Sequence, residues 1–137
     1  KFDRAEDNAL VRRGELLGIR VLLLSELGAA GQGALLQRGG DLRADIVIGG
    51  LPEQGEALTD AMLAAIQPRV IVLTDAEFPV SKRAKPALVA RLSRSGATVL
   101  RLTETGSLTV RFTWEGLLLK SVDGVPLARI PRPNTAR

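Results

Sequence analysis

Two carboxylates stand at places in the chain where a sheet could present them for chemistry. Glu26 follows the apolar run Leu22–Leu24, and Asp75 follows the apolar run Val70–Leu73. In an open α/β sheet, side chains just beyond the carboxyl ends of the strands face the crevice in which ligands bind. A carboxylate pair there could exchange protons with a substrate or hold Mg²⁺. Acidic residues at strand ends are also common as helix caps and solvated loop charges, so both residues keep a structural alternative.

The residue types missing from the chain limit this chemistry more than those present. The 137 residues include no His and no Cys, which are the commonest ligands of zinc in proteins. Without a histidine base, Ser25 and Ser81 have no partner for a nucleophilic triad. We therefore expect no tightly bound transition metal, no cofactor and no serine-type catalysis.

A run of basic residues is a second candidate for a binding site. Arg91 and Arg94 are three residues apart, a spacing that places both on one face of a helix. Such a run is usually a solvated face, but it could also track a phosphate backbone, and the net charge of +4 favours anionic partners. Only Phe78 is available nearby for base stacking. The candidate nucleic-acid-binding residues are Lys82, Arg83, Lys85, Arg91 and Arg94.

A glycine-rich segment at 28–33 offers a third candidate. It reads Gly-Ala-Ala-Gly-Gln-Gly after an apolar run, so it could cradle a phosphate at a helix N-terminus. The dinucleotide-binding fingerprint needs glycine at its first, third and sixth places, and the order here differs. We favour small residues for helix packing over phosphate binding.

The stretch from 44 to 58 organises the elements that must position these residues. Ile46–Ile48 is β-branched without polar alternation, as in a strand buried on both faces. Gly49 and Gly50 end the run, and Pro52 delays the next helix. We expect this strand at the centre of the sheet and its following loop at the mouth of any site.

Strands and helices alternate on both sides of this strand. The apolar run Val70–Thr74 predicts a second buried strand, reached through an amphipathic helix at 57–66, so the pair forms a right-handed parallel crossover. A helix at 86–95, opened by Pro86, leads by a second crossover to a strand at Thr98–Leu102. The remaining early elements are a helix at 29–37 and an antiparallel strand pair, Ala9–Arg13 and Ile19–Leu24, around the connection Gly14–Gly18.

The pattern changes after residue 106. Apolar and polar residues alternate over Ser107–Thr113, and Gly116–Ser121 follows a tight Trp114–Glu115 turn, which predicts an antiparallel hairpin. The last residues, 126–137, hold three Pro and three Arg, and we expect an irregular basic tail in which only Leu127 and Ile130 dock. Residues 1–125 are then one domain.

Five short segments carry a resemblance to a known family: Asp7-Asn8-Ala9-Leu10-Val11, Arg20-Val21-Leu22-Leu23-Leu24, Ala44-Asp45-Ile46-Val47, Gln67-Pro68-Arg69-Val70 and Arg101-Leu102-Thr103-Glu104-Thr105-Gly106-Ser107-Leu108-Thr109-Val110. In this order they resemble the carboxyl-terminal half of the metallo-β-lactamase-like domain of ComEC-type DNA-uptake (competence) proteins, over about residues 7–112. The resemblance implies a half-fold of the α/β class: a mixed sheet with parallel crossovers, flanking helices and a final antiparallel hairpin.

The positions of the family's metal ligands are changed in this chain. The aspartate of its Thr-Gly-Asp turn corresponds to Glu26, so a carboxylate remains as a vestigial position, with Asp75 as a second one. Its His-His-Gly turn falls on Leu51-Pro52-Glu53, and its His-Pro-His-Pro turn falls near Arg83-Ala84-Lys85-Pro86, without a retained ligand. The family's amino-terminal His-rich half has no counterpart here, which would leave one face of the sheet uncovered.

The expected function is a non-catalytic soluble domain of a ComEC-like membrane protein that binds DNA weakly and without sequence preference, or serves a structural role. No apolar run approaches the roughly 20 residues that span a bilayer, so segments outside this chain would tether it to the bacterial inner membrane. Other parts of the same protein, or a second copy held through the uncovered face, are the expected protein partners. Two alternatives remain: a metal-dependent nuclease or phosphodiesterase whose other ligands lie in a missing amino-terminal half, and an α/β protein-interaction module.

Overall fold

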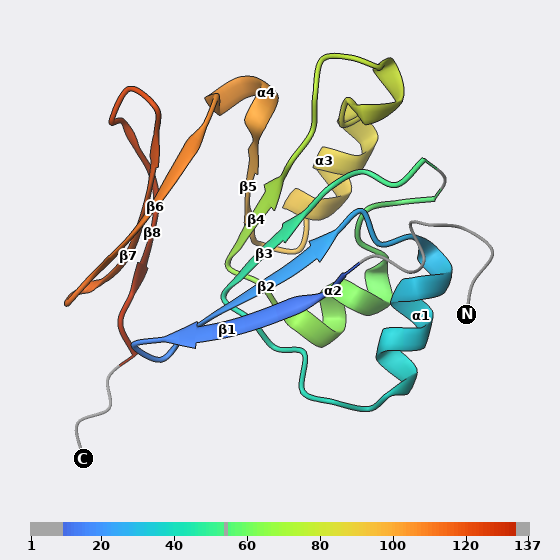
Figure 1. Cartoon of the computed structure of the whole chain (residues 1–137), viewed down its shortest axis with the longest axis horizontal. Helices are drawn as coiled ribbons and strands as arrows, with labels where there is room; N and C mark the ends of the chain where they lie inside the picture. The colour runs from blue at the N-terminus through green and yellow to red at the C-terminus, as the bar shows by residue number, and fades with distance from the viewer. Residues whose placement is uncertain (1–9, 54, 134–137) are drawn as a thin grey trace.

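The structure is a computed structural model that describes residues 10–53 and 55–133. It contains a five-stranded sheet of order β1-β2-β3-β4-β5 and a separate three-stranded sheet of order β6-β7-β8 (Figure 1). The predicted α/β class with a mixed sheet is confirmed. The first residues of the segment that resembles the ComEC-type opening, Asp7-Asn8-Ala9, lie outside the described residues.

The elements follow one another in a simple order. They are β1 (Arg12–Leu16), β2 (Ile19–Ser25), α1 (Ala29–Gln37), β3 (Ile46–Gly49), α2 (Asp60–Ile66), β4 (Val70–Leu73), the 3₁₀ turn η2 (Val80–Lys82), α3 (Pro86–Ser93), β5 (Thr98–Arg101), α4 (Leu102–Thr105), β6 (Leu108–Thr113), β7 (Gly116–Ser121) and β8 (Pro126–Pro131). None of the helices in these described ranges is long and apolar enough to cross a membrane.

The larger sheet places β3 at its centre, as its apolar sequence predicts. β2, β3, β4 and β5 pair in parallel, and β1 joins β2 antiparallel. All four residues of β4 are buried, in agreement with the prediction of a second strand covered on both faces. Since the parallel strands follow their order in the chain, the sheet lacks the order reversal that usually opens a ligand crevice in doubly wound folds.

Two hydrophobic clusters lie on the two faces of this sheet. Leu22 and Leu24 of β2 join the cluster that packs under α1, α2 and α3, whereas Ile19 of the same strand joins the opposite cluster. This division follows from the alternation of side chains along a strand. The second cluster includes Leu117, Leu119 and Ile130 of the three-stranded sheet, so the molecule has three layers: helices, large sheet and small sheet (Figure 1).

The C-terminal sheet corrects two expectations. Residues Pro126–Pro131 are strand β8 rather than an irregular tail, and Ala128 and Ile130 face inward while Arg129 points to solvent, a period-two pattern. Proline is tolerated there because Pro126 and Pro131 end a strand at the edge of the sheet. This strand helps to cover the face of β3, β4 and β5 that we expected to be open, so a second copy is not needed to bury it.

Two other elements have bounds that differ from the predicted ones, because of the turn or cap at one end. The β1–β2 connection is the two-residue turn Leu17–Gly18, with φ of 54° and 77°, so residues 14–16, expected in the loop, belong to β1. Positive φ at both central residues is the geometry that matches the twist of a β-hairpin. α2 starts at Asp60 because the Thr59 hydroxyl accepts a hydrogen bond from the Met62 N–H at 3.2 Å and caps the helix.

Candidate functional site

Glu26 lies at the carboxyl ends of the parallel strands, but a lysine occupies the place beside it. Lys82 Nζ donates to Glu26 Oε2 at 3.0 Å and to the Leu51 carbonyl at 2.8 Å. The ammonium therefore joins the end of β2 to the loop after β3. Gly50 leaves room for this arrangement, because a Cβ at that position would lie 2.7 Å from Glu26 Cγ.

The donor set at this edge does not fit the metal that the resemblance implies. A catalytic zinc site needs three protein ligands converging at about 2.0–2.2 Å. Here Lys82 brings a positive charge to the Glu26 carboxylate and to the Leu51 carbonyl, the place that a metal ion would need. Among the described residues there is no group of three or more His, Cys, Asp or Glu side chains that could hold a metal ion.

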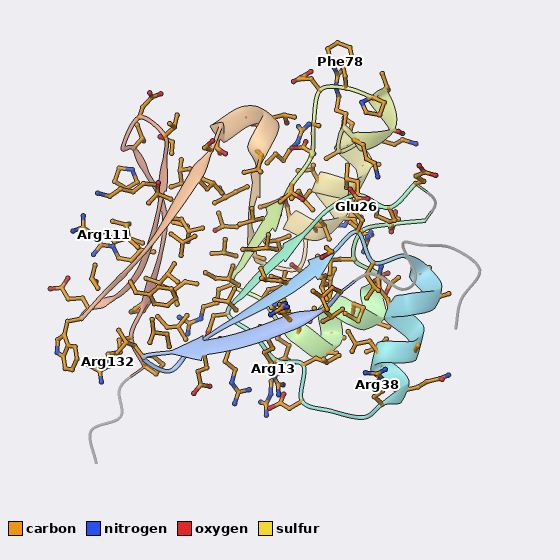
Figure 2. All side chains as sticks on the ribbon, viewed as in Figure 1. Arg13, Glu26, Arg38, Phe78, Arg111 and Arg132 are labelled. Carbon is orange, nitrogen blue, oxygen red and sulfur yellow. The ribbon has the colours of Figure 1, made fainter. Side chains whose placement is uncertain are left out.

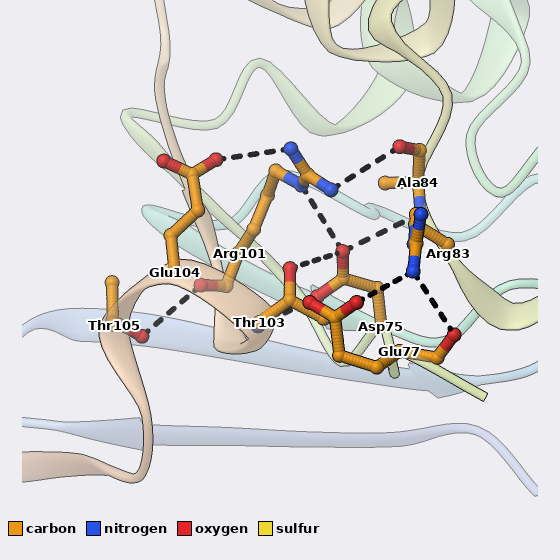
Figure 3. A network of polar contacts seen from close by, with 8 residues as sticks. All are labelled: Asp75, Glu77, Arg83, Ala84, Arg101, Thr103, Glu104 and Thr105. Atoms are coloured by element: carbon orange, nitrogen blue, oxygen red, sulfur yellow. Dashed lines mark hydrogen bonds and ion pairs between the residues drawn. The ribbon is translucent and has the colours of Figure 1, made fainter.

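Asp75 is buried in a different network of polar contacts, formed with Arg101, Thr103 and Ala84 (Figure 3). Its side chain has no exposed surface. Its Oδ2 accepts hydrogen bonds from Arg101 Nε at 3.0 Å and from the Thr103 hydroxyl at 2.8 Å. Its Oδ1 accepts from the Thr103 N–H at 3.0 Å, and the Ala84 N–H lies 3.4 Å from Oδ2.

These donors decide the ionisation of Asp75. Burial alone would raise its pKa, but the hydrogen bonds from Thr103, Arg101 and Ala84 outweigh burial, and the pKa lies below the ordinary aspartate value. Asp75 is thus a structural anion that ties the end of β4 to α4 and to the loop before α3. The two carboxylates considered as an acid/base pair do not share a site, since each has its own cation.

Three of the five predicted nucleic-acid-binding cations are already paired. Lys82 holds Glu26, and Arg83 forms an ion pair with Glu77 at 2.6 Å. Arg91 is only 15% exposed and forms ion pairs with Glu56 at 2.6 Å and Asp60 at 2.8 Å. It also donates to the Leu58 carbonyl, so this guanidinium fastens the start of α2 to α3.

Lys85 and Arg94 are the two members of this run that are exposed and without an ion pair to any residue in the described ranges. They cap opposite ends of α3, whose eight residues span about 12 Å at 1.5 Å per residue. The predicted patch is therefore divided. A cavity of about 250 Å³ beside Lys85 is lined by both cations and carboxylates, including Arg83, Glu53 and Glu56, so it does not favour one sign of charge.

The glycine-rich segment uses its polar side chain to hold the protein together. Gln32 is fully buried, and its Nε2 donates to the carbonyls of Leu27, Glu56 and Ala57 at 3.0–3.2 Å. Its Oε1 accepts from the Thr59 N–H at 2.9 Å. These bonds favour the packing role over the phosphate-binding alternative for this segment.

The basic residues that the sequence analysis passed over lie on the outer face of the C-terminal sheet. Arg111 and Arg129 are exposed, and Figure 2 shows Arg111 pointing away from the larger sheet. The alternation of polar and apolar residues in β6 carried this signal, because it assigns Arg111 to the face opposite Val110 and Phe112. In β8 polar and apolar residues alternate in the same way, but the sequence predicts an irregular tail there and so does not assign Arg129 to a face.

Comparison with known proteins assigns no function to the site around Glu26 or to the outer face of the C-terminal sheet. No protein-family model matches the chain, and no curated protein matches it either.

Proposed function

We propose that this chain is a non-catalytic domain of a ComEC-like DNA-uptake protein that binds DNA through its phosphates and without sequence preference. The observation that carries the proposal is the position of Lys82 Nζ, which donates hydrogen bonds to the Glu26 carboxylate and to the Leu51 carbonyl. At the edge where the resembling family places a metal, this chain places its own cation.

The arrangement of the acidic groups supports a role without catalysis. A general acid or base must reach a substrate with a free carboxyl oxygen. The Asp75 oxygens are occupied by four donors and shielded from solvent, and Glu26 is held by an ammonium. Asp75 is therefore closed to a substrate, and Glu26, whose side chain is 53% exposed, has its Oε2 bound to Lys82.

The distribution of charge supports an anionic partner. The net charge is +4, and the exposed cations Arg111 and Arg129 of the C-terminal sheet make no ion pair within the described ranges. Cations that neutralise phosphates bind DNA regardless of its sequence, and the affinity falls steeply with salt. Such a domain would concentrate DNA near the membrane to which other segments of the protein tether it.

A protein-interaction module is the second candidate function. Phe78 is 80% exposed and Val80 is 70% exposed, both in the loop that precedes α3, and Figure 2 shows Phe78 at the tip of that loop. Exposed apolar side chains of this size are enriched at protein contacts. If the domain fails to bind DNA, the protein-interaction module becomes the favoured function.

Fluorescence anisotropy of labelled DNA tests the proposal. Two duplexes of unrelated sequence should bind with the same affinity, and the log–log dependence on salt should have a slope of roughly −3 to −4.5 if three to five phosphates are contacted. A strong preference for one duplex, or no binding at low salt, would contradict it. Replacing Phe78 with Ala should leave this affinity unchanged and serves as the control for the second candidate.

A further inference from the structure

The outer face of the C-terminal sheet gathers cations from three strands. Arg111 of β6 and Arg129 of β8 both pair across from Leu118 of β7. Neighbouring strands lie about 4.8 Å apart, so the two arginines flank Leu118 within about 10 Å of each other. Lys120 of β7 is the diagonal neighbour of Arg111, at a typical distance of about 7–8 Å. The three cations therefore surround one small apolar spot.

Within the described ranges, these three cations form no ion pair. Every ion pair between described residues joins side chains in the range 15–104. Over residues 107–133 the acidic residues are Glu115 and Asp123, both in turns between strands. By the strand register, Thr109, Thr113, Leu118 and Pro131 share the outer face with the cations, and Glu115 is the acidic residue that lines the cavity beside Trp114.

An aromatic platform stands at one end of the same face. Trp114, in the β6–β7 turn, is 75% exposed, and the Arg132 guanidinium lies 4.2 Å from the centroid of its ring. A cavity of about 360 Å³ next to the indole is lined by Trp114, Leu118 and Arg129, among others. The hollow thus joins the ring to Arg129, and the Glu115 side chain also lines it.

We infer that this outer face, formed by Arg111, Lys120, Arg129 and Trp114, binds a single-stranded polynucleotide, with its phosphates on the three cations and a base against the Trp114 ring. The inference rests on the proposed function and specifies where on the molecule that function is performed. Base–aromatic stacking combined with a basic surface is the general mode by which proteins hold single strands without reading sequence. A duplex keeps its bases stacked inside, so it can use the cations but not the indole.

Two triple variants that remove the same charge test the location. Arg111→Ala/Lys120→Ala/Arg129→Ala removes the cations of the outer face. Arg38→Ala/Lys85→Ala/Arg94→Ala removes three exposed cations of the α/β layers that make no ion pair within the described ranges. For a labelled oligo(dT), the first variant should flatten the log–log salt slope by about 2 units, at about 0.7 per lost contact, and the second should leave the slope unchanged.

Trp114→Ala tests the stacking separately from the charge. The affinity for oligo(dT) should fall roughly 5- to 150-fold, the worth of one stacked base, while the salt slope stays the same. Trp114→Phe should retain most of the affinity. Loss of affinity in both variants together with a flattened slope would show that the indole acts through Arg132 rather than through a base.

The intrinsic fluorescence of the unmodified protein gives an independent readout, because Trp114 is the only tryptophan in the chain. Oligo(dT) and oligo(U) share the phosphates and the pyrimidine rings, so both should quench Trp114. Inorganic polyphosphate should compete for the cations without quenching. Equal quenching by polyphosphate, or a blue shift with anionic phospholipid vesicles in the absence of quenching by either oligonucleotide, would overturn the inference.

The outcomes separate this inference from the proposed function. If the variant of the α/β layers flattens the slope and the variant of the outer face does not, DNA binding stands and the sheet surface is the wrong location. If neither single-stranded nor duplex DNA binds the unmodified protein at low salt, both proposals fall.

Discussion

At the scale of single residues, Glu26 and Asp75 follow apolar strands in the same way but meet different partners. Their positions at strand ends could be predicted because apolar runs mark buried strands. Their partners could not: Lys82 lies 56 residues from Glu26, and Arg101 lies 26 residues from Asp75. Sequence spacing places side chains along one element, and the contacts between elements depend on loop paths that no short pattern encodes.

Asp75 should make stability sensitive to acid. Its pKa is lowered in the folded state, so its contribution is present above the unfolded value of about 3.9 and is lost as pH falls through the lower folded pKa. Asp75→Asn should cost roughly 1.5–3 kcal/mol at neutral pH, the worth of hydrogen bonds to a charged group, and the variant should lose less stability below about pH 4. Urea unfolding across pH measures both effects. Asp123→Asn, in an exposed turn, should leave the profile unchanged, and an Asp75→Asn profile identical to it would contradict the structural role.

Arg91 should matter for stability rather than for DNA. Arg91→Ala removes a largely buried guanidinium that bonds to Glu56, Asp60 and the Leu58 carbonyl, and should cost roughly 1–3 kcal/mol. Arg94→Ala removes an exposed cation and should change stability by less than about 0.5 kcal/mol. Chemical denaturation compares the two. If Arg91→Ala left stability intact but flattened the salt slope of DNA binding, Arg91 would belong to the binding surface after all.

At the scale of elements, periodic sequences predicted most of the architecture. The helix at 29–37, the two buried strands and the hairpin after residue 107 appear in the structure close to their expected bounds. The sequence does not predict β8, because Pro126, Pro131 and Pro133 are typical of irregular structure. The prolines instead stand at the ends of an edge strand and beyond it, where a missing N–H costs little.

Gly116 should be the most sensitive position in the C-terminal sheet. Its φ is 143°, and a Cβ there would lie 2.2 Å from the Ile130 carbonyl oxygen, a contact that the backbone of β8 cannot absorb without moving. Gly116→Ala should cost more than about 2 kcal/mol, in the range of large strain effects. Gly14→Ala is the matched control, because nothing lies within 4 Å of its Cβ position. Thermal unfolding distinguishes them, and equal midpoints would contradict the close approach of β7 and β8.

At the scale of the whole molecule, the small sheet completes the core. Ile46, Val70 and Val72 are at most 3% exposed because Leu117, Leu119 and Ile130 pack against them. The sequence resemblance ends near residue 112, inside β6, so it could not reveal that the chain covers this face itself.

A chain ending at residue 106 should therefore not fold stably. It would expose the apolar face of β3 and β4, and each Å² of exposed apolar surface costs about 25 cal/mol. Since the free energy of unfolding of a native protein is only about 5–15 kcal/mol, this loss should unfold the shortened chain. We expect it to bind a hydrophobic dye and to lack the cooperative thermal unfolding of the 137-residue chain. A cooperative transition in the shorter chain would show that the two layers fold independently.

Binding and cleavage of the same DNA, followed in one mixture, test the central claim of binding without catalysis most directly. Labelled single-stranded DNA is incubated with the protein at low salt with Mg²⁺ or Mn²⁺, its anisotropy is recorded, and its length is then read on a denaturing gel. We predict raised anisotropy and a strand of unchanged length, in the unmodified protein and in Glu26→Gln alike. If the unmodified protein shortened the DNA and the Glu26→Gln variant left it intact, the claim would be contradicted. The carboxylate at the end of β2 would then be part of a nuclease site.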